Sequence, residues 1–336
     1  MKIFNKNTEK DILFIAEIGV NHEGNLDAAK DLIHKAAFAG ADAVKFQSYN
    51  PEKFVSSADQ ERMKRIKKFS MTKENHIELI STAKKCNINF FSSAITEDWI
   101  PFLEENCEVI KIASGDLTFE PTLIAAASSK CKLILSTGLG TLSEIDRAIE
   151  IIRQNTSETD LNSKLALLHC ISAYPTPIEE ANILSIPFLK ERYNLEVGFS
   201  NHIVGIEASL AAIANGAKLI EVHFTDNKHN RNFHDHALSA DPEDFKLLVN
   251  MGKKIQLSLG KYEKIRQNSE IPNLNTIRKG LVAAKNLKKN TILMRSDLMF
   301  ARPATFFSSN QLNDLIGKRL LNKKSLGESI EPSEIK

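Results

Sequence analysis

The chain has 336 residues, of which 42% are hydrophobic and 26% are charged, and its formal net charge is +2. The length suits a (β/α)8 barrel of roughly 250 residues followed by a small second domain. The charge is too small to favour a nucleic-acid partner, and no apolar run is long enough to span a membrane. Four cysteines without a C-x-x-C pair and a polar N-terminus lead us to expect a cytoplasmic protein.

Short β-rich runs alternate with amphipathic helical stretches from residue 13 onward. We predict eight strands, at residues 13–20, 43–49, 89–94, 109–114, 132–138, 165–172, 196–201 and 219–225. Strand–helix alternation indicates a parallel sheet, and eight such units favour a closed α/β TIM barrel. The alternative is a doubly wound open sheet, but no G-x-G-x-x-G turn follows the first predicted strand.

The chain divides into a barrel and a smaller module. A last helix over residues 241–260 would complete a barrel domain spanning residues 1–260. Residues 261–277 are polar and contain a Pro-Asn pair, so we interpret them as a linker. Residues 278–336 have short β-like runs and one helical run, which predicts a separate small domain.

Polar residues gather where the predicted strands end, which is where such barrels carry their active sites. A barrel interior is normally apolar, so buried charges there need partners or a ligand. We therefore expect Lys45 and Lys111 to bind an anion, unless each is a rim residue paired with Glu17 or Asp116. The polar residues at these ends are Glu17, Lys45, Gln47, Ser93, Lys111, Ser114, Asp116, Ser136, His169, Tyr174, His202, Glu221 and His223.

Two further patterns indicate a metal and a phosphate. His202 and His223 end neighbouring strands and could hold a divalent metal with open positions, although rim histidines with ordinary hydrogen bonds are the alternative. Small hydroxyls and glycines near the two lysines are typical of an anion cradle, although they also fit tight turns. Competing metal candidates on the sequence are His169, His229, His234 and His236, and the cradle residues are Ser93, Ser114, Gly115, Ser136, Thr137 and Gly138.

Several motifs occur in order and at fitting spacings over nearly the whole chain. They are IAEIGVNHEGNLDAAK, AGADAVKFQ, KIASGD, STG, HC-x-x-x-YPTP, VGFSNH-x-x-G, IEVHFT and DH-x-x-S. Together they resemble the sialic acid synthase family, and the module from residue 278 resembles its antifreeze-like (SAF) domain. The resemblance implies an enzyme that condenses phosphoenolpyruvate with an N-acylated aminohexose, with C–O cleavage and phosphate release. The sugar would be N-acetylmannosamine or a diacetamido-trideoxyhexose of the legionaminic or pseudaminic type.

The resemblance also implies residue roles and an assembly. A divalent metal, commonly manganese although magnesium or cobalt also fit, would be held by His202 and His223, and Glu17 and Asp116 would act as acid or base. The family forms a homodimer whose second domain swaps to cap the partner's site, and Arg302 would reach the sugar's N-acyl group there. Contacts to phosphoenolpyruvate would come from Lys45, Lys111, Ser114, Ser136 and Lys279, and contacts to the sugar from Gln47, Tyr174 and Asp235.

Some residues depart from the family pattern, and other functions stay open. Asp116 stands where many members have Glu, and Pro303-Ala304 follows Arg302 in place of a Gly-rich turn. A class I aldolase would instead use Lys45 or Lys111 as a Schiff-base amine. A surface-binding role for the last module or a structural coat role are the non-catalytic alternatives, but the charged runs LKKN and GKRLLNKK do not suit a flat apolar binding face.

Overall fold

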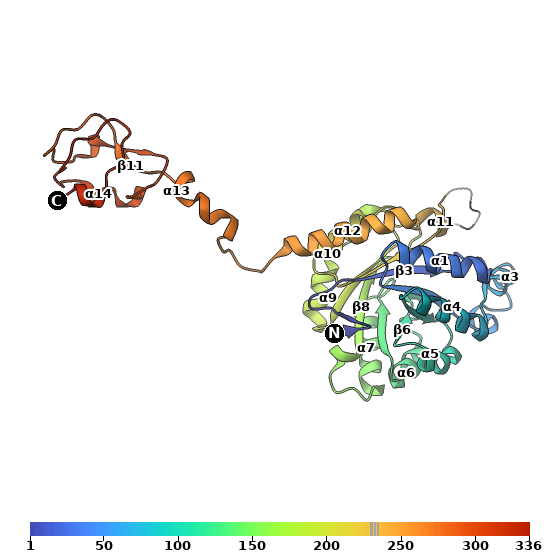
Figure 1. Cartoon of the computed structure of the whole chain (residues 1–336). Coiled ribbons are helices and arrows are strands. Elements are labelled where there is room, and N and C mark those ends of the chain that lie inside the picture. The colour runs from blue at the N-terminus through green and yellow to red at the C-terminus, as the bar shows by residue number, and fades with distance from the viewer. Residues whose placement is uncertain (229–230, 232, 234) are drawn as a thin grey trace. The chain divides into compact units, whose positions relative to one another are not determined.

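A computed structural model of the chain describes residues 1–228, 231, 233 and 235–336. These residues form two compact units, residues 1–260 and residues 261–336 (Figure 1). No helix in the described part of the chain is long and apolar enough to cross a membrane.

The first unit is a closed barrel of eight parallel strands, which confirms the predicted fold. Strand β10 pairs with β3 and closes the ring, with Leu219 opposite Leu13. Several predicted strands end early because their last residues turn into loops, as at η2 (Ser114–Asp116). In barrel order the strands are β3 (Leu13–Gly19), β4 (Ala43–Ser48), β5 (Asn89–Ala94), β6 (Val109–Ile112), β7 (Lys132–Ser136), β8 (Leu165–Cys170), β9 (Glu196–Asn201) and β10 (Leu219–His223).

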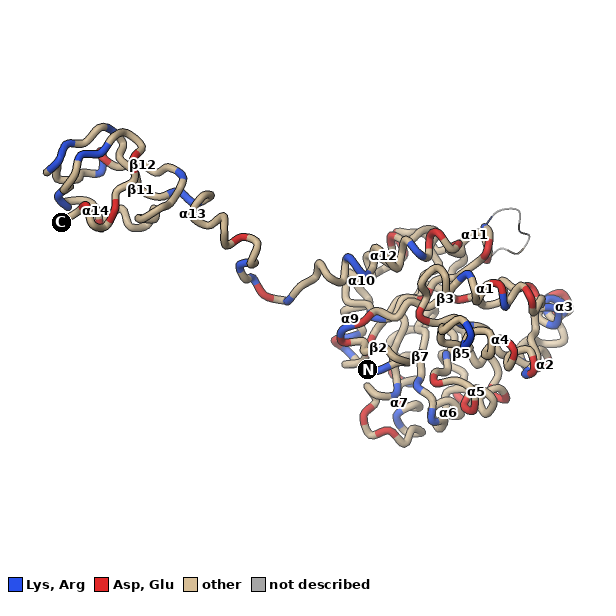
Figure 2. The backbone as a smooth tube through the Cα atoms, in the orientation of Figure 1, with Lys and Arg blue, Asp and Glu red and all other residues tan. Residues whose placement is uncertain are grey.

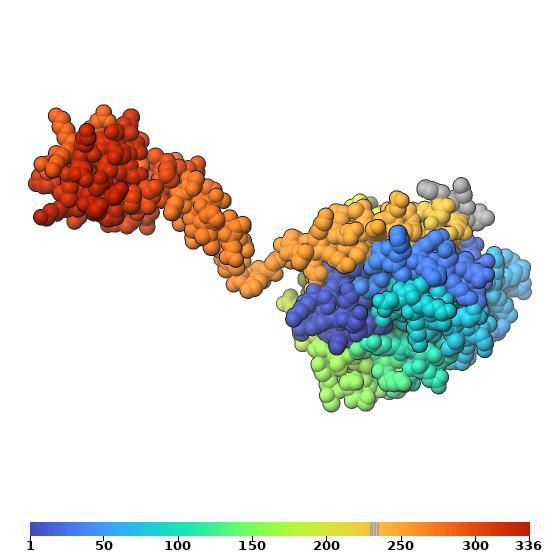
Figure 3. Space-filling view, viewed as in Figure 1, coloured from blue at the N-terminus to red at the C-terminus, as the bar shows by residue number. Residues whose placement is uncertain are grey.

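Helices surround the barrel, and their ends are set by capping side chains. Thr72 and Thr141 form capping boxes, and Asp241 caps the last helix, which has proline in its first turn. This last helix is α12 (Pro242–Leu259), and Figure 3 shows it beside α1 (Leu26–Phe38) on the surface of the barrel unit. The first and last main helices therefore complete the outer layer. The main helices are α1 (Leu26–Phe38), α4 (Lys73–Lys85), α5 (Ile100–Asn106), α6 (Glu120–Ser128), α7 (Leu142–Asn155), α9 (Ser185–Tyr193), α10 (Glu207–Ala214) and α12 (Pro242–Leu259).

A helical excursion that the sequence analysis does not predict lies between β4 and α4. It consists of α2 (Pro51–Phe54) and α3 (Gln60–Phe69), and Figure 2 shows lysine and arginine along α3. Tyr49 anchors the excursion, because its hydroxyl donates to the Ile66 carbonyl at 3.2 Å and its ring lies 5.1 Å from that of Phe54. Shorter helical turns are α8 (Leu161–Lys164), α11 (Asp235–Leu238), η1 (Glu97–Trp99) and η3 (Ile178–Glu180).

The N-terminal end of the barrel is closed by a short hairpin, which the sequence analysis also misses. Strand β1 (Lys2–Ile3) pairs antiparallel with β2 (Lys6–Asn7). Ile3 is fully buried against an apolar layer of inward-facing side chains. That layer consists of Leu13, Ile15, Ala43, Phe91, Val109, Ile134, Ala166, Leu168 and Leu219.

The second unit has its own small core. Strand β11 (Gly280–Ala283) pairs antiparallel with β12 (Leu298–Ala301), around buried leucines. Part of the segment interpreted as a linker is helical, as η4 (Asn268–Asn273) and α13 (Leu274–Ile277), and a capping box at Gln267 begins it. The remaining elements are η5 (Arg295–Asp297), η6 (Ser309–Gln311), α14 (Leu312–Leu315) and η7 (Pro332–Glu334).

Candidate active site

The inward-facing positions of the barrel change from apolar to charged along the same strands. Ile15 in β3 belongs to the apolar layer, whereas Glu17 lines a cavity at the C-terminal end. Val109 and Lys111 in β6 show the same change. Residues two apart share a face of a strand, so alternation carries these charges into the barrel interior.

The cavity has a volume of about 320 Å³. It brings together most of the side chains that the sequence analysis selects, from all eight strands or the loops that follow them. The predicted site residues that line it are Glu17, Lys45, Gln47, Ser93, Lys111, Ser114, Ser136, Tyr174, His202 and His223, and Glu221 joins them.

Lys45 lies at the centre of a buried charge cluster. Its Nζ is 2.7 Å from Glu17 Oε2 and 3.6 Å from Glu221 Oε1, and it donates to Ser93 Oγ at 3.1 Å. Burial raises the pKa of Glu17 to about 7, although Lys45 opposes the shift. Burial alone would lower the pKa of Lys45, but Glu17 and Glu221 outweigh it and the pKa rises. The predicted pairing with Glu17 therefore exists, but within the barrel rather than at its rim.

Lys111 has a different environment from Lys45. Its Nζ donates to Ser136 Oγ at 2.6 Å and to the Ile112 carbonyl at 3.0 Å. Burial lowers its pKa, with Glu221 partly opposing the change. None of the ion pairs among the described residues includes Lys111, so the alternative of pairing with Glu17 or Asp116 is wrong for this lysine. A buried cation beside hydroxyls can accept an anionic ligand.

Gly138 leaves space beside Ser114 and Ser172, which line the same cavity as Lys111. A Cβ atom added there would lie 2.4 Å from Ser172 Oγ, 2.7 Å from Ser114 Oγ and 3.0 Å from Cys170 Sγ. The Ser172 hydroxyl is buried, and no described residue forms a hydrogen bond with it. Three polar or polarisable atoms thus converge on one small space, which favours the cradle interpretation over a simple turn.

The two predicted metal ligands lie together. The ring centroids of His202 and His223 are 5.3 Å apart, and the Tyr174 ring is 4.2 Å from that of His202. Burial lowers the pKa of His202, and its Nδ1 lies 2.6 Å from the Ile171 carbonyl. A neutral imidazole that donates from Nδ1 presents the Nε2 lone pair, the form in which histidine commonly binds metals.

The donor set fits an open metal site. The described residues contain no group of three or more His, Cys, Asp or Glu side chains that could hold a metal. A metal bound by His202 and His223 alone would leave its other positions to water or substrate. Of the competing candidates, His169 contacts the Ala181 carbonyl at 2.9 Å in a neighbouring pocket. His229 and His234 lie outside the described residues.

Asp116 lies in η2 and lines an outer lobe that adjoins the cavity, rather than the cavity itself. Gln47 and Tyr174 line both spaces. Burial raises the pKa of Asp116 to about 6, with Lys111 opposing the shift. Both predicted acid or base carboxyls therefore have pKa values near neutrality, where a proton-transfer group is most effective.

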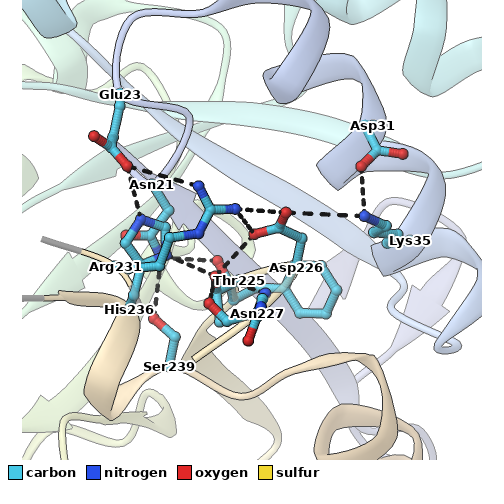
Figure 4. Close-up of polar contacts among 11 residues, drawn as sticks. Asn21, Glu23, Asp31, Lys35, Thr225, Asp226, Asn227, Arg231, His236 and Ser239 are labelled. Carbon is cyan, nitrogen blue, oxygen red and sulfur yellow. Dashed lines mark hydrogen bonds and ion pairs between the residues drawn. The ribbon is translucent and has the colours of Figure 1, made fainter. Parts of the chain in front are cut away.

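A polar network that includes Asn21, Glu23, Thr225, His236 and Ser239 joins the loop after β3 to the segment after β10 (Figure 4). His236 lies between Thr225 Oγ1, at 2.7 Å, and Glu23 Oε1, at 3.3 Å. Asn21, in the loop after β3, donates to Ser239 Oγ at 3.0 Å, and Ser239 in turn donates to the Asp235 carbonyl at 2.6 Å. The loop after β3 and the segment after β10 are thus held together, which fixes the start of α11.

Asp235 does not line the cavity or the adjoining lobe, although its charge acts on Tyr174, which lines both. The pKa of Tyr174 rises mainly through burial, and the charges of Cys170 and Asp235 add to the shift. The predicted sugar contacts Gln47, Tyr174 and Asp235 therefore all come from the barrel unit.

The other two predicted site residues belong to the second unit. Lys279 and Arg302 are exposed there, and the Arg302 guanidinium donates to the Ile277 carbonyl of the same unit. Their roles stay predictions.

Among the polar residues that line the cavity, Glu221, Ser200 and Ser172 have no predicted role. Glu221 accepts a hydrogen bond from Ser200 at 2.9 Å and contributes to the Lys45 cluster. The sequence does place Glu221 among the polar strand-end residues, two residues before His223, but it does not reveal the contact with Lys45. Ser172 precedes Tyr174 by two residues in a loop, where no periodicity identifies the orientation of its side chain.

The family comparison and the similar proteins named in this paragraph indicate the same protein family. Residues 32–264 match the NeuB family. The chain is 38% identical to the N,N'-diacetyllegionaminic acid synthase of Campylobacter jejuni, over 92% of this chain and 96% of that protein. It is 31% identical to a pseudaminic acid synthase of Campylobacter jejuni over the whole of both chains. A crystal structure of N-acetylneuraminic acid synthetase from Leptospira borgpetersenii, in complex with citrate, is 35% identical with a TM-score of 0.74, over 78% of this chain and 90% of that one.

Proposed function

Since the chain belongs to the NeuB family and is a synthase of nonulosonic acids, we propose that its barrel cavity binds phosphoenolpyruvate beside an N-acylated aminohexose. The observation that supports this placement best is Lys111, a buried cation next to Ser136 with no carboxylate partner among the described residues. Lys111 and the hydroxyls around Gly138 would hold the phosphate and carboxylate of phosphoenolpyruvate.

The reaction needs a carbon nucleophile, an electrophilic carbonyl and a water molecule. C3 of phosphoenolpyruvate forms a bond to the aldehyde carbon of the open-chain sugar, and the π electrons of the carbonyl move to its oxygen, which takes up a proton and becomes a hydroxyl. The electron-poor C2 takes up water. The C2–O bond to phosphate then breaks, so phosphate leaves with the bridging oxygen. Glu17 or Asp116 would remove the proton from the water, and Lys45 would stabilise the ionised form of Glu17.

A divalent metal at His202 and His223, which we propose to be manganese, would supply Lewis-acid polarisation of the sugar's carbonyl oxygen when bound. The chain's own contribution is orientation: the Ile171 carbonyl fixes the tautomer of His202. Both imidazoles would then face the reacting end of the sugar.

Oxygen-18 in the bridging position of phosphoenolpyruvate tests the reaction course. The label should leave with phosphate, because the C–O bond breaks. Label retained in the sugar product would contradict the proposal and indicate P–O cleavage.

A class I aldolase is the second candidate, because burial lowers the pKa of Lys111, as a Schiff-base amine requires. Borohydride treatment in the presence of pyruvate separates the two functions. We expect no covalent adduct, and an adduct at Lys111 would favour the aldolase.

We also propose a homodimer in which Arg302 serves the site of a second copy, through a swapped SAF domain. Mixed Arg302→Ala and His223→Ala chains test this arrangement, because a heterodimer should regain one complete site. No recovery after verified subunit exchange would contradict it.

We propose a cytoplasmic location, which agrees with the four free thiols.

A further inference from the structure

The outer lobe next to the barrel cavity is a separate recognition space. Its volume is about 630 Å³. It shares five lining residues with the inner cavity, so one ligand can occupy both spaces. The shared residues are Gln47, Ile95, Ala113, Gly115 and Tyr174. Its remaining wall includes residues from the α2–α3 excursion, which the proposed reaction does not use.

The excursion presents an arginine on an aromatic support. The Arg62 guanidinium carbon lies 5.6 Å from the centroid of the Phe54 ring, and both residues line the outer lobe. Tyr49 holds the Phe54 ring and the α3 backbone in place through the contacts described above. Arg62 is exposed, and the Phe54 ring that supports its guanidinium is held in place, which lowers the entropic cost of a hydrogen bond from this side chain.

The charge balance of the lobe does not favour a phosphate group. Lys53 is already paired with Glu97 at 2.9 Å and with Asp98 at 3.5 Å. Asp116 adds another carboxyl to the lining. The charge of Lys53 is thus already balanced by Glu97 and Asp98, and a phosphate dianion in the lobe would meet repulsion from Asp116 as well as attraction to Arg62.

Arg62 remains as a donor for a neutral acceptor. Of the ion pairs among the described residues, none involves Arg62. Phe54 and the 39% exposed Phe119 provide apolar contact beside it. A carbonyl oxygen next to a methyl group, as in an acylamino substituent, matches a guanidinium donor beside aromatic rings.

We propose that Arg62 and Phe54 form a specificity subsite for an uncharged acylamino group on the part of the sugar remote from its aldehyde. The inference rests on the proposed function, because it assumes that the aldehyde reacts in the inner cavity. It makes a diacylated aminohexose the preferred substrate over a monoacylated or a phosphorylated one.

Steady-state kinetics with three sugars test the subsite. The sugars are 2,4-diacetamido-2,4,6-trideoxymannose, N-acetylmannosamine and N-acetylmannosamine 6-phosphate, with phosphate release from phosphoenolpyruvate as the readout. For the diacetamido sugar, Arg62→Ala should lower kcat/KM by about 10- to 100-fold, the range expected for a hydrogen bond to a charged donor. The KM for phosphoenolpyruvate and the constants for N-acetylmannosamine should stay the same.

Two variants act as controls. Lys64→Ala removes another cation from α3 that is paired with Glu61 and does not line the lobe, so all constants should be unchanged. Arg62→Lys keeps the charge but loses the planar donor, so its constants should lie between those of wild type and Arg62→Ala.

The possible failures are distinct. If Arg62→Ala weakened all three sugars equally, the subsite would be wrong while the synthase function stood. If wild type preferred the phosphorylated sugar and Arg62→Ala removed that preference, Arg62 would be an anion site. If wild type released no phosphate with any sugar, the proposed function would fall and the subsite with it.

Discussion

The two ends of the barrel interior differ although the same strands build them. At the N-terminal end Leu13 and Ile15 belong to a layer of fully buried apolar side chains that Ile3 covers. Glu17, which lies two residues after Ile15 on the same strand, belongs to a buried cluster of charges. Apolar burial stabilises the fold, whereas burial of charge opposes it. The strands therefore provide inward-facing positions at both ends of the barrel. An apolar side chain at such a position stabilises the fold, whereas a charged one can take part in binding or catalysis.

The largest effect should come from His202→Ala at the charged end. We expect turnover to fall by about 1,000-fold or more, because Lewis-acid catalysis contributes several kcal/mol. The melting temperature should change little. Phosphate-release rates in chelator-treated enzyme, before and after addition of manganese, provide the measurement. A variant that kept a tenth of the wild-type rate would show that His202 is a rim histidine.

Lys111→Met should lower kcat/KM by about 100-fold, because a preorganised charge next to the reacting group is lost. Stability should stay the same or rise, because methionine avoids the cost of a buried cation. Thermal unfolding and steady-state kinetics measure the two effects.

Ile15→Ala is the matched variant at the apolar end of the barrel. It should lower the free energy of unfolding by about 2–5 kcal/mol and leave kcat/KM of the folded enzyme unchanged. If Lys111→Met instead destabilised the protein as much as Ile15→Ala, the distinction between the two ends would fail.

The pH profile of kcat/KM for phosphoenolpyruvate should distinguish the two candidate bases. The base must be ionised, so activity falls tenfold for each pH unit below its pKa. With Glu17 as base the fall should begin near pH 7, and with Asp116 near pH 6. We expect the Glu17 value. In Glu17→Gln this limb should disappear, whereas persistence of the limb would assign the base role to Asp116.

The smallest effect should come from His236→Gln, outside both ends of the barrel interior. Loss of the bridge between Thr225 and Glu23 should loosen Asp235 and raise the KM of the sugar about threefold to tenfold, the range of one neutral hydrogen bond. The KM of phosphoenolpyruvate should stay constant. Lys35→Ala, at the edge of the same network, is the control, and equal shifts in both KM values would argue against a positioning role.

Structural elements whose apolar residues recur at regular spacing could be predicted from the sequence, whereas very short elements and single side-chain contacts could not. All eight barrel strands were predictable because apolar runs alternate with helical patterns. The two-residue strands of the N-terminal hairpin are too short to show a period. Helix α3 is charged over most of its surface, and its apolar row consists only of Met63, Ile66 and Phe69, of which Phe69 alone is buried, so the helical pattern is short and weak in the sequence.

The same distinction applies to the candidate site, where strand positions could be predicted and individual contacts could not. Lys45, Lys111, His202 and His223 could be selected because they are polar residues within, or directly after, predicted strands, and all four line the cavity. The unpaired state of Lys111 could not be predicted, since it depends on which carboxylates lie opposite after the barrel closes. Ser172 faces the cavity from a loop, where direction follows from the whole backbone path rather than from spacing.

Gly138 illustrates a constraint of a different kind. It carries no reactive group, yet the space left by its missing side chain lets Ser114, Cys170 and Ser172 converge. Even alanine would fill that space. A residue without a functional group can thus decide which functional groups meet, because the space that it leaves sets where the neighbouring hydroxyl and thiol groups can lie.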